Sequence, residues 1–281
     1  MTPSQDYAFT IDIRWPVLEQ DSRLLPPADI IIIRDDDDDR PPYFTFSSPH
    51  LDELTVPEEI WARGLALSRL YVGAYNLINN ADEGGSSWIG SGRLHNLYVR
   101  EGRRYSEVNV SKPDDILPAN PFSRAISDQP LPRHVHPESN VISQLIYLAR
   151  TNDDLLSILI QLGSPLTWQN LYKVLDTIKY RSRQKSKKYY KNQLLTAAGV
   201  SESEVGAFTG VANNYELLGE LGRHGENGEG TPKNQMNLYD SIRLIIKLCK
   251  AYINLTHNID TGPLSKENPI TRDSLFQPKS L

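Results

Sequence analysis

Two adjacent residues, Arg223 and His224, carry the side chains that metal-independent RNA cleavage requires. That reaction needs a base for the ribose 2′-hydroxyl, an acid for the leaving oxygen and a positive charge at the phosphate. Histidine serves either proton-transfer role near neutral pH, and arginine binds a phosphorane-like state through its planar guanidinium. Asn213 or Asn214 could orient the phosphate. One Arg-His pair supplies half of such a site, so a two-fold dimer would complete it.

A structural role for the same pair is the alternative. His224 could cap the end of a helix, Gly225 could take the left-handed conformation there, and Arg223 could fasten the Gly- and Glu-rich loop that follows. Consecutive residues of a helix point about 100° apart, which favours this role unless the helix has already ended. The candidate carboxylate partners of Arg223 are Glu216, Glu226 and Glu229.

The stretch from Lys179 to Lys191 is the best candidate for a polyanion-binding surface, because it contains no acidic residue. Cations neutralise phosphates, and the tyrosines interleaved with them, Tyr180, Tyr189 and Tyr190, can stack on unpaired bases if they are exposed. A solvated helix end whose lysines confer solubility is the alternative. The candidate RNA-binding residues are Lys179, Arg181, Arg183, Lys185, Lys187, Lys188, Tyr189, Tyr190 and Lys191.

The overall composition is that of a folded protein with a moderately acidic surface. Apolar residues make up 39% of the chain and charged residues 23%, and the formal net charge is -5. This charge argues against a protein that coats nucleic acid over its whole surface, but it allows a local basic patch. We expect no membrane span, because no apolar run reaches the roughly 18 residues required. The first residues lack a signal-peptide pattern, so the expected location is the cytoplasm.

The sequence predicts neither a metal nor a cofactor. Cys249 is the single cysteine and lies on an apolar helical stripe, which excludes a multi-cysteine site. The run Asp35–Asp39 lacks the alternating carboxylates and turn glycine of a calcium loop, so we expect a solvated hairpin tip. His134 and His136 have no third ligand nearby. The chain also lacks a phosphate loop, a nucleophile elbow and a His-Glu-x-x-His motif.

Residues 1–112 are predicted to form a small α+β domain with a mixed or antiparallel sheet and one long helix. Residues 7–15 alternate strictly between apolar and polar, which is typical of a strand with one buried face. Four consecutive isoleucines at 30–33 suggest a strand covered on both sides. The other expected elements are strands over 43–47, 94–100 and 104–111 and a helix over 55–80. Their role is unknown, and a protein partner is possible.

A proline-rich linker over residues 113–137 is expected to lead into an all-α helical bundle over 138–256, followed by a loose tail over 257–281. Thr167, Ser201 and Asn237 are predicted helix N-caps, and Ser201 with Glu204 forms a capping box. Gly199 suits a helix C-terminus. One helix is predicted to run from Ser201 through Leu218 towards Arg223.

Several motifs of the C-terminal half resemble the helical domain of the HEPN superfamily, in a class of mostly uncharacterised bacterial proteins with an Arg-His-Gly motif. The similarity covers about residues 140–255, and nothing comparable is recognised in 1–112. The residues that carry it are Trp168, Leu171, Tyr172, Lys173, Asp176, Ile178, Phe208, Ala212, Asn213, Arg223, His224, Gly225, Pro232, Met236, Leu238 and Ser241.

The resemblance implies a metal-independent endoribonuclease or RNA-binding effector of a toxin or anti-phage system, acting as a homodimer through its helical domain. In catalytic members a spacer of several residues separates the arginine from the histidine, whereas Arg223 and His224 are adjacent. This difference fits a variant arrangement at the helix end or a fold that has lost the chemistry. The second hypothesis is therefore a non-catalytic interaction protein that dimerises or docks on a partner.

Overall fold

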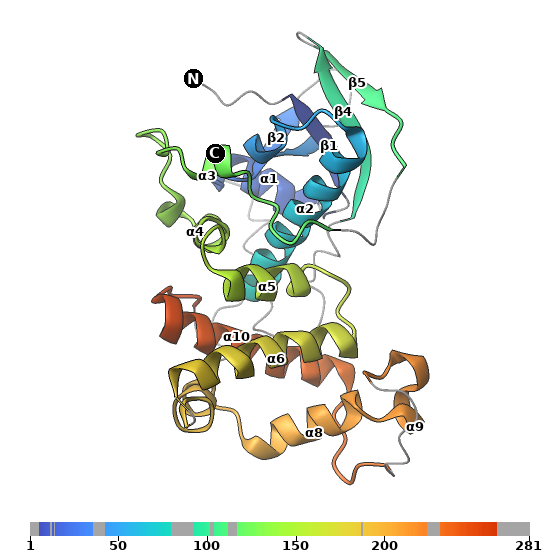
Figure 1. The fold of residues 1–281 in the computed structure, drawn as a ribbon, viewed down its shortest axis with the longest axis vertical. Coiled ribbons are helices and arrows are strands. Elements are labelled where there is room, and N and C mark those ends of the chain that lie inside the picture. Colours follow the sequence, from blue (N-terminus) through green and yellow to red (C-terminus); the bar gives the residue numbers. More distant parts are fainter. Residues whose placement is uncertain are drawn as a thin grey trace, which may run out of the picture.

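The computed structural model describes residues 6–11, 13, 15–35, 43–79, 93–101, 104–111, 117–186, 188–223 and 231–262. A sheet with flanking helices occupies one end of the molecule and a stack of helices the other (Figure 1). The predicted α+β class with a helical C-terminal part is therefore confirmed. Within the described residues, none of the helices combines the length and apolar character needed to cross a bilayer.

The sheet has five strands in the order β2-β3-β1-β4-β5, and all neighbouring pairs are antiparallel. Phe9 of the central strand lies opposite Phe46 on one side and Leu97 on the other. The predicted hairpin around the aspartate run forms between β2 and β3, although residues 36–42 lie outside the described part. The strands are β1 (Tyr7–Ile11), β2 (Ile31–Asp35), β3 (Tyr43–Ser47), β4 (Leu94–Glu101) and β5 (Arg104–Val108).

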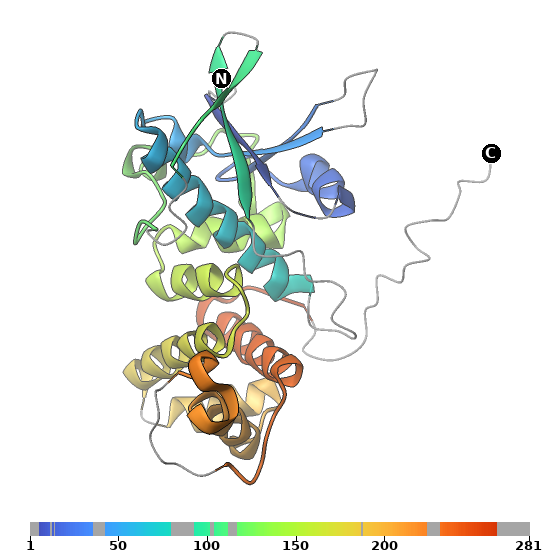
Figure 2. The ribbon, with the colours of Figure 1, turned by 90° about the vertical axis from the view of Figure 1, so that its right-hand side faces the viewer.

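Two helices pack on the sheet (Figure 2), and Tyr71 of one donates a hydrogen bond to Asp21 of the other. Helix α2 (Pro57–Asn79) packs against β1, where the Trp61 and Phe9 ring centroids are 5.9 Å apart. Helix α1 (Trp15–Leu24) packs against β2. The strand predicted over 7–15 is therefore too long. Pro16 explains the difference, because proline cannot donate to a strand ladder but suits the first turn of a helix.

The helical half begins with α3 (Arg124–Ser127), η2 (Pro137–Ser139), α4 (Val141–Ala149) and α5 (Asp153–Leu162). It continues with α6 (Trp168–Lys185), the π-helical turn η3 (Tyr190–Leu194), α7 (Leu195–Ala198) and α8 (Glu202–Ala212). It ends with α9 (Tyr215–Leu218), η4 (Gly219–Leu221) and α10 (Leu238–His257). The capping box of Ser201 and the left-handed Gly199 are present as predicted. The predicted 201–218 helix instead stops at Ala212, because Asn214 caps a new helix.

The two halves meet where α2 crosses α5, the most extensive helix–helix contact of the structure. A Cβ atom added to Gly73 would lie less than 3.0 Å from the Leu159 carbonyl oxygen, and one added to Gly163 would approach the Arg69 carbonyl as closely. Only glycine permits such an approach of two backbones. The Asn76 side-chain amide also donates to the Leu162 carbonyl at 3.1 Å.

A buried ionic network makes a second connection between the halves. Asp29 accepts hydrogen bonds from His50 Nε2 and from Arg150 Nε, both at 2.7 Å. The backbone N–H of Ser123 donates to His50 Nδ1 at 3.1 Å, so the Nε2 atom carries the imidazole proton. Asp29 and His50 are completely enclosed, which makes this network costly to break by removing any one member.

The predicted linker lies along these connections. In its described part Phe122 and Val135 are buried, and the Phe122 ring contacts the His50 ring at 5.1 Å between centroids. The buried residues of the sheet and of the helical stack join in one hydrophobic cluster. The division into domains at residues 112 and 138 stays a prediction.

The substitution Gly73→Ala tests the contact between α2 and α5. Because the new methyl group would push the helices apart, we expect the free energy of unfolding to fall by about 3 kcal/mol or more. Urea denaturation followed by circular dichroism measures this change. Gly206→Ala in α8 is the matched control: its Cβ would meet nothing within 4 Å. That variant should gain up to about 1 kcal/mol from helix propensity. Wild-type stability of Gly73→Ala would contradict the close contact.

Two enclosed carboxyl groups of the sheet-bearing half titrate near neutral pH. Burial raises the pKa of Asp21, which accepts a hydrogen bond from the Tyr71 hydroxyl, from 3.8 to about 6. Burial also raises the pKa of Asp52 from 3.8 to about 7, despite a hydrogen bond from the Asp6 backbone. The folded protein thus binds these protons more tightly than the unfolded chain. The stabilisation that these two carboxyl groups provide is complete below about pH 4. It is lost as the pH rises through their pKa values in the folded protein, about 6 for Asp21 and about 7 for Asp52.

Replacement of Asp52 by Asn removes one of these titrations but keeps an acceptor oxygen for Asp6. We expect a higher free energy of unfolding at pH 8 and a smaller decrease between about pH 5 and pH 8 than in the wild type. Urea denaturation across this pH range gives both quantities. Asp128→Asn, at the exposed end of α3, should reproduce the wild-type profile. The same profile for Asp52→Asn would show that this carboxyl does not titrate as described.

Candidate nucleic-acid interface

Helix α6 carries the first part of the basic stretch and divides it between two faces. Because an α-helix turns about 100° per residue, Tyr172, Asp176, Lys179 and Arg183 follow one another along one side, which we call the Lys179 face. Arg181 and Lys185 lie on another side, here called the Arg181 face. The predicted single surface is therefore two surfaces, separated around the helix by Tyr180.

Arg223 is held against the Lys179 face. Its guanidinium carbon lies 3.9 Å from the centroid of the Tyr172 ring, and its Nη2 atom lies 3.1 Å from Asp176 Oδ2. Its backbone N–H donates to the Ala212 carbonyl at 2.8 Å. The Gln169 side chain of the same helix donates to the Gly222 carbonyl at 3.0 Å, so α6 fixes the segment that leads to Arg223.

Asp176 is thus the observed ion-pair partner of Arg223 in the described part of the chain, in place of the three glutamates expected from the sequence. Two of these, Glu226 and Glu229, lie outside the described residues, as does His224. The geometry shows an anchoring role for the Arg223 side chain. A catalytic role together with His224 stays a prediction.

Lys179 lies in a field of positive charge. Burial lowers the pKa of its ammonium group, and the charges of Arg183 and Arg223 lower it further, whereas Asp176 opposes them. Arg183 makes no ion pair within the described residues, and it is exposed. Lys179 therefore feels two neighbouring cations and one carboxylate, and a bound anion would relieve the repulsion between the cations.

The tyrosines of the basic stretch differ in their exposure. Tyr180 is 60% exposed on the outer side of α6. Tyr189 belongs to the hydrophobic core, and the hydroxyl of Tyr190 is enclosed, with the Lys179 ammonium 5.7 Å from the ring. The chain leaves the helix at Ser186 and re-enters as a π-helical turn, which rotates Tyr189 and Tyr190 inward. Of these three tyrosines, Tyr180 is therefore the one with an exposed ring.

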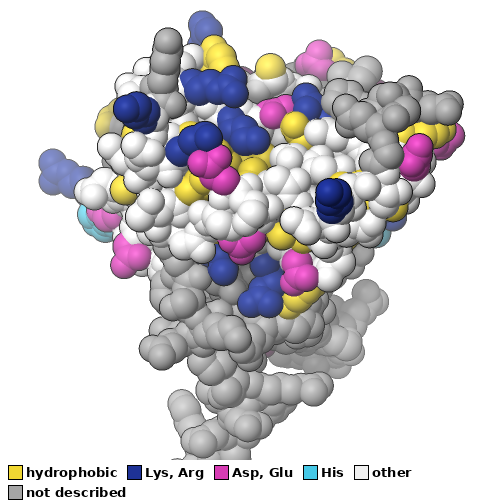
Figure 3. Space-filling view, turned by 90° about the horizontal axis from the view of Figure 1, so that it is seen from below, with side chains coloured by type: hydrophobic (Ala, Val, Ile, Leu, Met, Phe, Trp, Pro, Cys, Tyr) yellow, Lys and Arg dark blue, Asp and Glu magenta, His cyan; other side chains and the backbone are white. Residues whose placement is uncertain are grey.

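The remaining basic residues have individual partners. On the Arg181 face, Arg181 lies 3.8 Å from Asp153, and Lys185 Nζ donates to Thr256 Oγ1 at 3.2 Å. Lys191 pairs with Glu202 at 2.6 Å. Lys188 is exposed, and Lys187 lies outside the described residues. Lys and Arg side chains gather on one side of this end of the molecule, with a few acidic side chains among them (Figure 3).

The two candidate phosphate-orienting residues sit at the break between α8 and α9. Asn214 is buried, and its side chain accepts the Leu217 N–H at 2.9 Å as the N-cap of α9. The Asn214 side-chain oxygen is therefore already engaged by a backbone N–H of the protein. Asn213 ends α8, and its Oδ1 atom is enclosed without a hydrogen-bond partner among the described residues.

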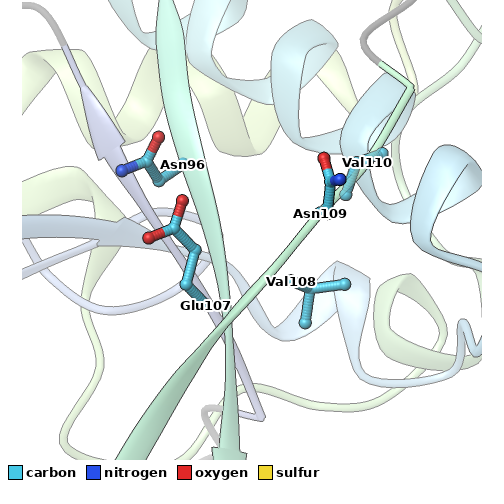
Figure 4. Close-up of a pocket in the computed structure, with 5 residues that line it drawn as sticks. All are labelled: Asn96, Glu107, Val108, Asn109 and Val110. Atoms are coloured by element: carbon cyan, nitrogen blue, oxygen red, sulfur yellow. The ribbon is translucent and has the colours of Figure 1, made fainter.

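A hollow of about 280 Å³ lies at the other end of the molecule, beside the β4–β5 hairpin. The side chains of Asn96 and Glu107 point toward each other from neighbouring strands, and Asn109 lies further along (Figure 4). No basic side chain lines this hollow within the described residues, so it does not suit a polyanion.

The described residues also contain no cluster of His, Cys, Asp or Glu that could hold a metal ion. Cys249 is buried, which raises the pKa of its thiol.

Arg223→Ala tests the anchoring of the segment that leads from η4 to Arg223. We expect a loss of about 1 kcal/mol in unfolding free energy, chiefly from the contact with Tyr172, because the ion pair is half exposed. Hydrogen exchange of the backbone amides of 219–223 should become faster. Arg183→Ala, on the same face but without an ion pair among the described residues, should change stability by less than about 0.5 kcal/mol. Equal exchange in both variants would exclude an anchoring role.

The signal for the Lys179 face was present in the sequence as the helical spacing of Tyr172, Asp176, Lys179 and Arg183. The signal for Arg223 was not, because its partners are distant in the chain. No family model, curated protein or solved structure matches this chain.

Proposed function

We propose that the helical half binds single-stranded RNA across α6. The observation that carries the proposal is that Lys179 lies within the electrostatic influence of Arg183 and Arg223, while the next residue of α6, Tyr180, exposes its ring. Cations and an exposed aromatic ring are the two components by which proteins hold unpaired nucleic acid. The resemblance of the sequence to HEPN-like proteins supports RNA as the nucleic acid.

The charge balance of the interface supports a polyanion as the ligand. Asp176 pairs with Arg223, and among the described residues Lys179 and Arg183 make no ion pair, in a chain whose net charge is -5. A phosphate near Lys179 would relieve the repulsion that lowers the pKa of its ammonium group. Each phosphate contact releases counterions, so the binding should be strongest at low salt.

Tyr180 supplies an exposed aromatic ring, which a surface made of lysines alone does not have. Its ring stands on the outer side of α6, between the Lys179 face and the Arg181 face, and the Arg181 guanidinium lies 5.8 Å from its centroid. A base stacked on this ring would have cations on both sides for its flanking phosphates. Such stacking contributes about 1–3 kcal/mol per base.

The expected role of Arg223 in this proposal is electrostatic. Its guanidinium retains an exposed portion after pairing with Asp176, so it can contribute charge to a bound phosphate. A homodimer, a partner for residues 1–112, a cytoplasmic location and a role in a toxin or anti-phage system remain separate predictions. RNA binding by α6 depends on none of them. The alternative, a protein that only dimerises or docks on another protein, would not bind RNA across α6.

Neutralisation of Lys179 and Arg183 to Gln tests the proposal. In fluorescence anisotropy with a labelled single-stranded oligoribonucleotide, the Kd of the double variant should rise at least about tenfold at low salt. The slope of log Kd against log salt should decrease by about 1.4, because two contacts are lost at about 0.7 each. Tyr180→Ala should weaken binding by about 1–3 kcal/mol with an unchanged slope.

The matched control is Lys191→Gln with Arg124→Gln. Lys191 is already paired with Glu202, and Arg124 lies in α3, away from α6. This double variant removes the same number of positive charges and should bind RNA nearly as the wild type does. If both double variants weaken RNA binding equally, the effect comes from the net charge of the protein and not from the α6 surface. Binding that does not depend on salt would exclude the proposed interface.

A further inference from the structure

A second set of reactive side chains lies where the C-terminal end of α10 meets the start of α5. Asp154 Oδ2 accepts a hydrogen bond from the Tyr252 hydroxyl at 2.6 Å, and His257 Nε2 lies 3.2 Å from the same oxygen. The Tyr252 and His257 rings meet edge to face, with centroids 6.2 Å apart. This group could not be predicted from the sequence, because Asp154 and His257 are far apart in the chain.

The arrangement fixes which nitrogen of the imidazole is available. Burial would raise the pKa of Asp154, but hydrogen bonds from His257 and Tyr252 and the charge of His257 bring it well below its usual value. An ionised Asp154 accepts a hydrogen bond from His257 Nε2–H, so in the neutral ring the Nδ1 atom is the basic one. Nδ1 has no hydrogen-bond partner within the described residues. Carboxylate-oriented histidines with one free nitrogen are suited to proton transfer.

Cations of the Arg181 face contact the chain neighbours of Asp154 and His257. Arg181 pairs with Asp153, the neighbour of Asp154, and acts electrostatically on Tyr252. Lys185 Nζ contacts Thr256, the residue before His257. Arg181 also follows Tyr180 directly in α6. An RNA strand stacked on Tyr180 and crossing the helix would therefore bring a phosphate to Arg181, Lys185 and His257 together.

We infer that His257, oriented by Asp154 and flanked by Arg181 and Lys185, is the proton-transfer residue of an RNA-cleaving site. The inference rests on the proposed function, because the strand must first bind across α6. Nδ1 takes the proton of a ribose 2′-hydroxyl, whose oxygen forms a bond to the adjacent phosphorus. The bond from phosphorus to the 5′ oxygen breaks with its electron pair. Water protonates that oxygen, and the resulting hydroxide takes the proton from His257.

This reaction needs no metal and leaves a 2′,3′-cyclic phosphate and a 5′-hydroxyl. Arg181 and Lys185 would neutralise the charge that develops on the phosphate oxygens. The end of α10 does not require His257 as a cap, since Asn258 closes that helix in the left-handed conformation with φ 54°. Proton transfer would account for a histidine at this position whose Nδ1 atom has no hydrogen-bond partner within the described residues.

The test uses the full chain, an end-labelled single-stranded oligoribonucleotide and EDTA, with products resolved on a denaturing gel. His257→Gln should cleave at least about 100-fold more slowly than the wild type, while its Kd for RNA by anisotropy stays unchanged. His134→Gln, at an exposed position, is the matched control and should cleave as the wild type does. His224→Gln separates this site from the one expected at Arg223 and His224.

Each outcome decides between the two proposals. Loss of cleavage with retained binding in His257→Gln alone supports the inference. Wild-type cleavage by His257→Gln, or loss of cleavage only in His224→Gln, overturns it. Binding without any cleavage by the wild type overturns it while leaving RNA binding intact. An absence of binding rejects the proposed function together with the inference.

A measurement on the wild-type chain covers the case in which His257→Gln does not fold. The same oligonucleotide with a single ribose left in an otherwise deoxyribose strand should be cut only after that ribose, and the 5′ fragment should end in a cyclic phosphate by mass spectrometry. Cleavage of the all-deoxyribose strand, or a fragment with a plain 3′-hydroxyl, would contradict attack by a 2′-hydroxyl.

Discussion

The close approach of α2 and α5 at Gly73 and Gly163 is the constraint on which the rest of the structure depends. A buried glycine pair lets two helix backbones touch, and no larger residue fits there without moving one of them. The sheet packs on α2, and α5 packs on α6, so the position of the basic helix relative to the sheet follows from this one crossing. The network of Asp29, His50 and Arg150 reinforces it from the side of α4.

Helix α6 connects this framework to the chemistry. Its inner side is apolar and holds α5, α8 and α10 in place, while its outer residues carry cations and Tyr180. Because the inner side is fixed, the directions of Lys179 and Arg181 are fixed as well. Arg223 contacts one face of α6, and Arg181 on the other face pairs with Asp153, the neighbour of Asp154. The proposed binding surface on α6 and the proposed proton-transfer group at the ends of α5 and α10 are thus held together by helix packing, which would keep a bound strand aligned.

Local patterns predicted most of the elements. The capping signals at Thr167, Ser201 and Asn237 each mark a helix start, because a cap is a contact between residues three apart. Periodicity failed at Trp15 and beyond Ala212, where Pro16 and Asn214 change the backbone within one residue. The partners of Arg223 and His257 could not be predicted, since Asp176 and Asp154 come from other helices and are brought close only by packing.

Ultraviolet cross-linking of the wild-type chain to an RNA substituted with 4-thiouridine, followed by peptide mapping, measures directly whether single-stranded RNA crosses α6 over Tyr180, as we propose. We expect cross-links at Tyr180 and its neighbours in α6, reduced by high salt and absent from the β4–β5 hairpin. Cross-links confined to the sheet, or an even distribution over the surface that persists at high salt, would contradict it.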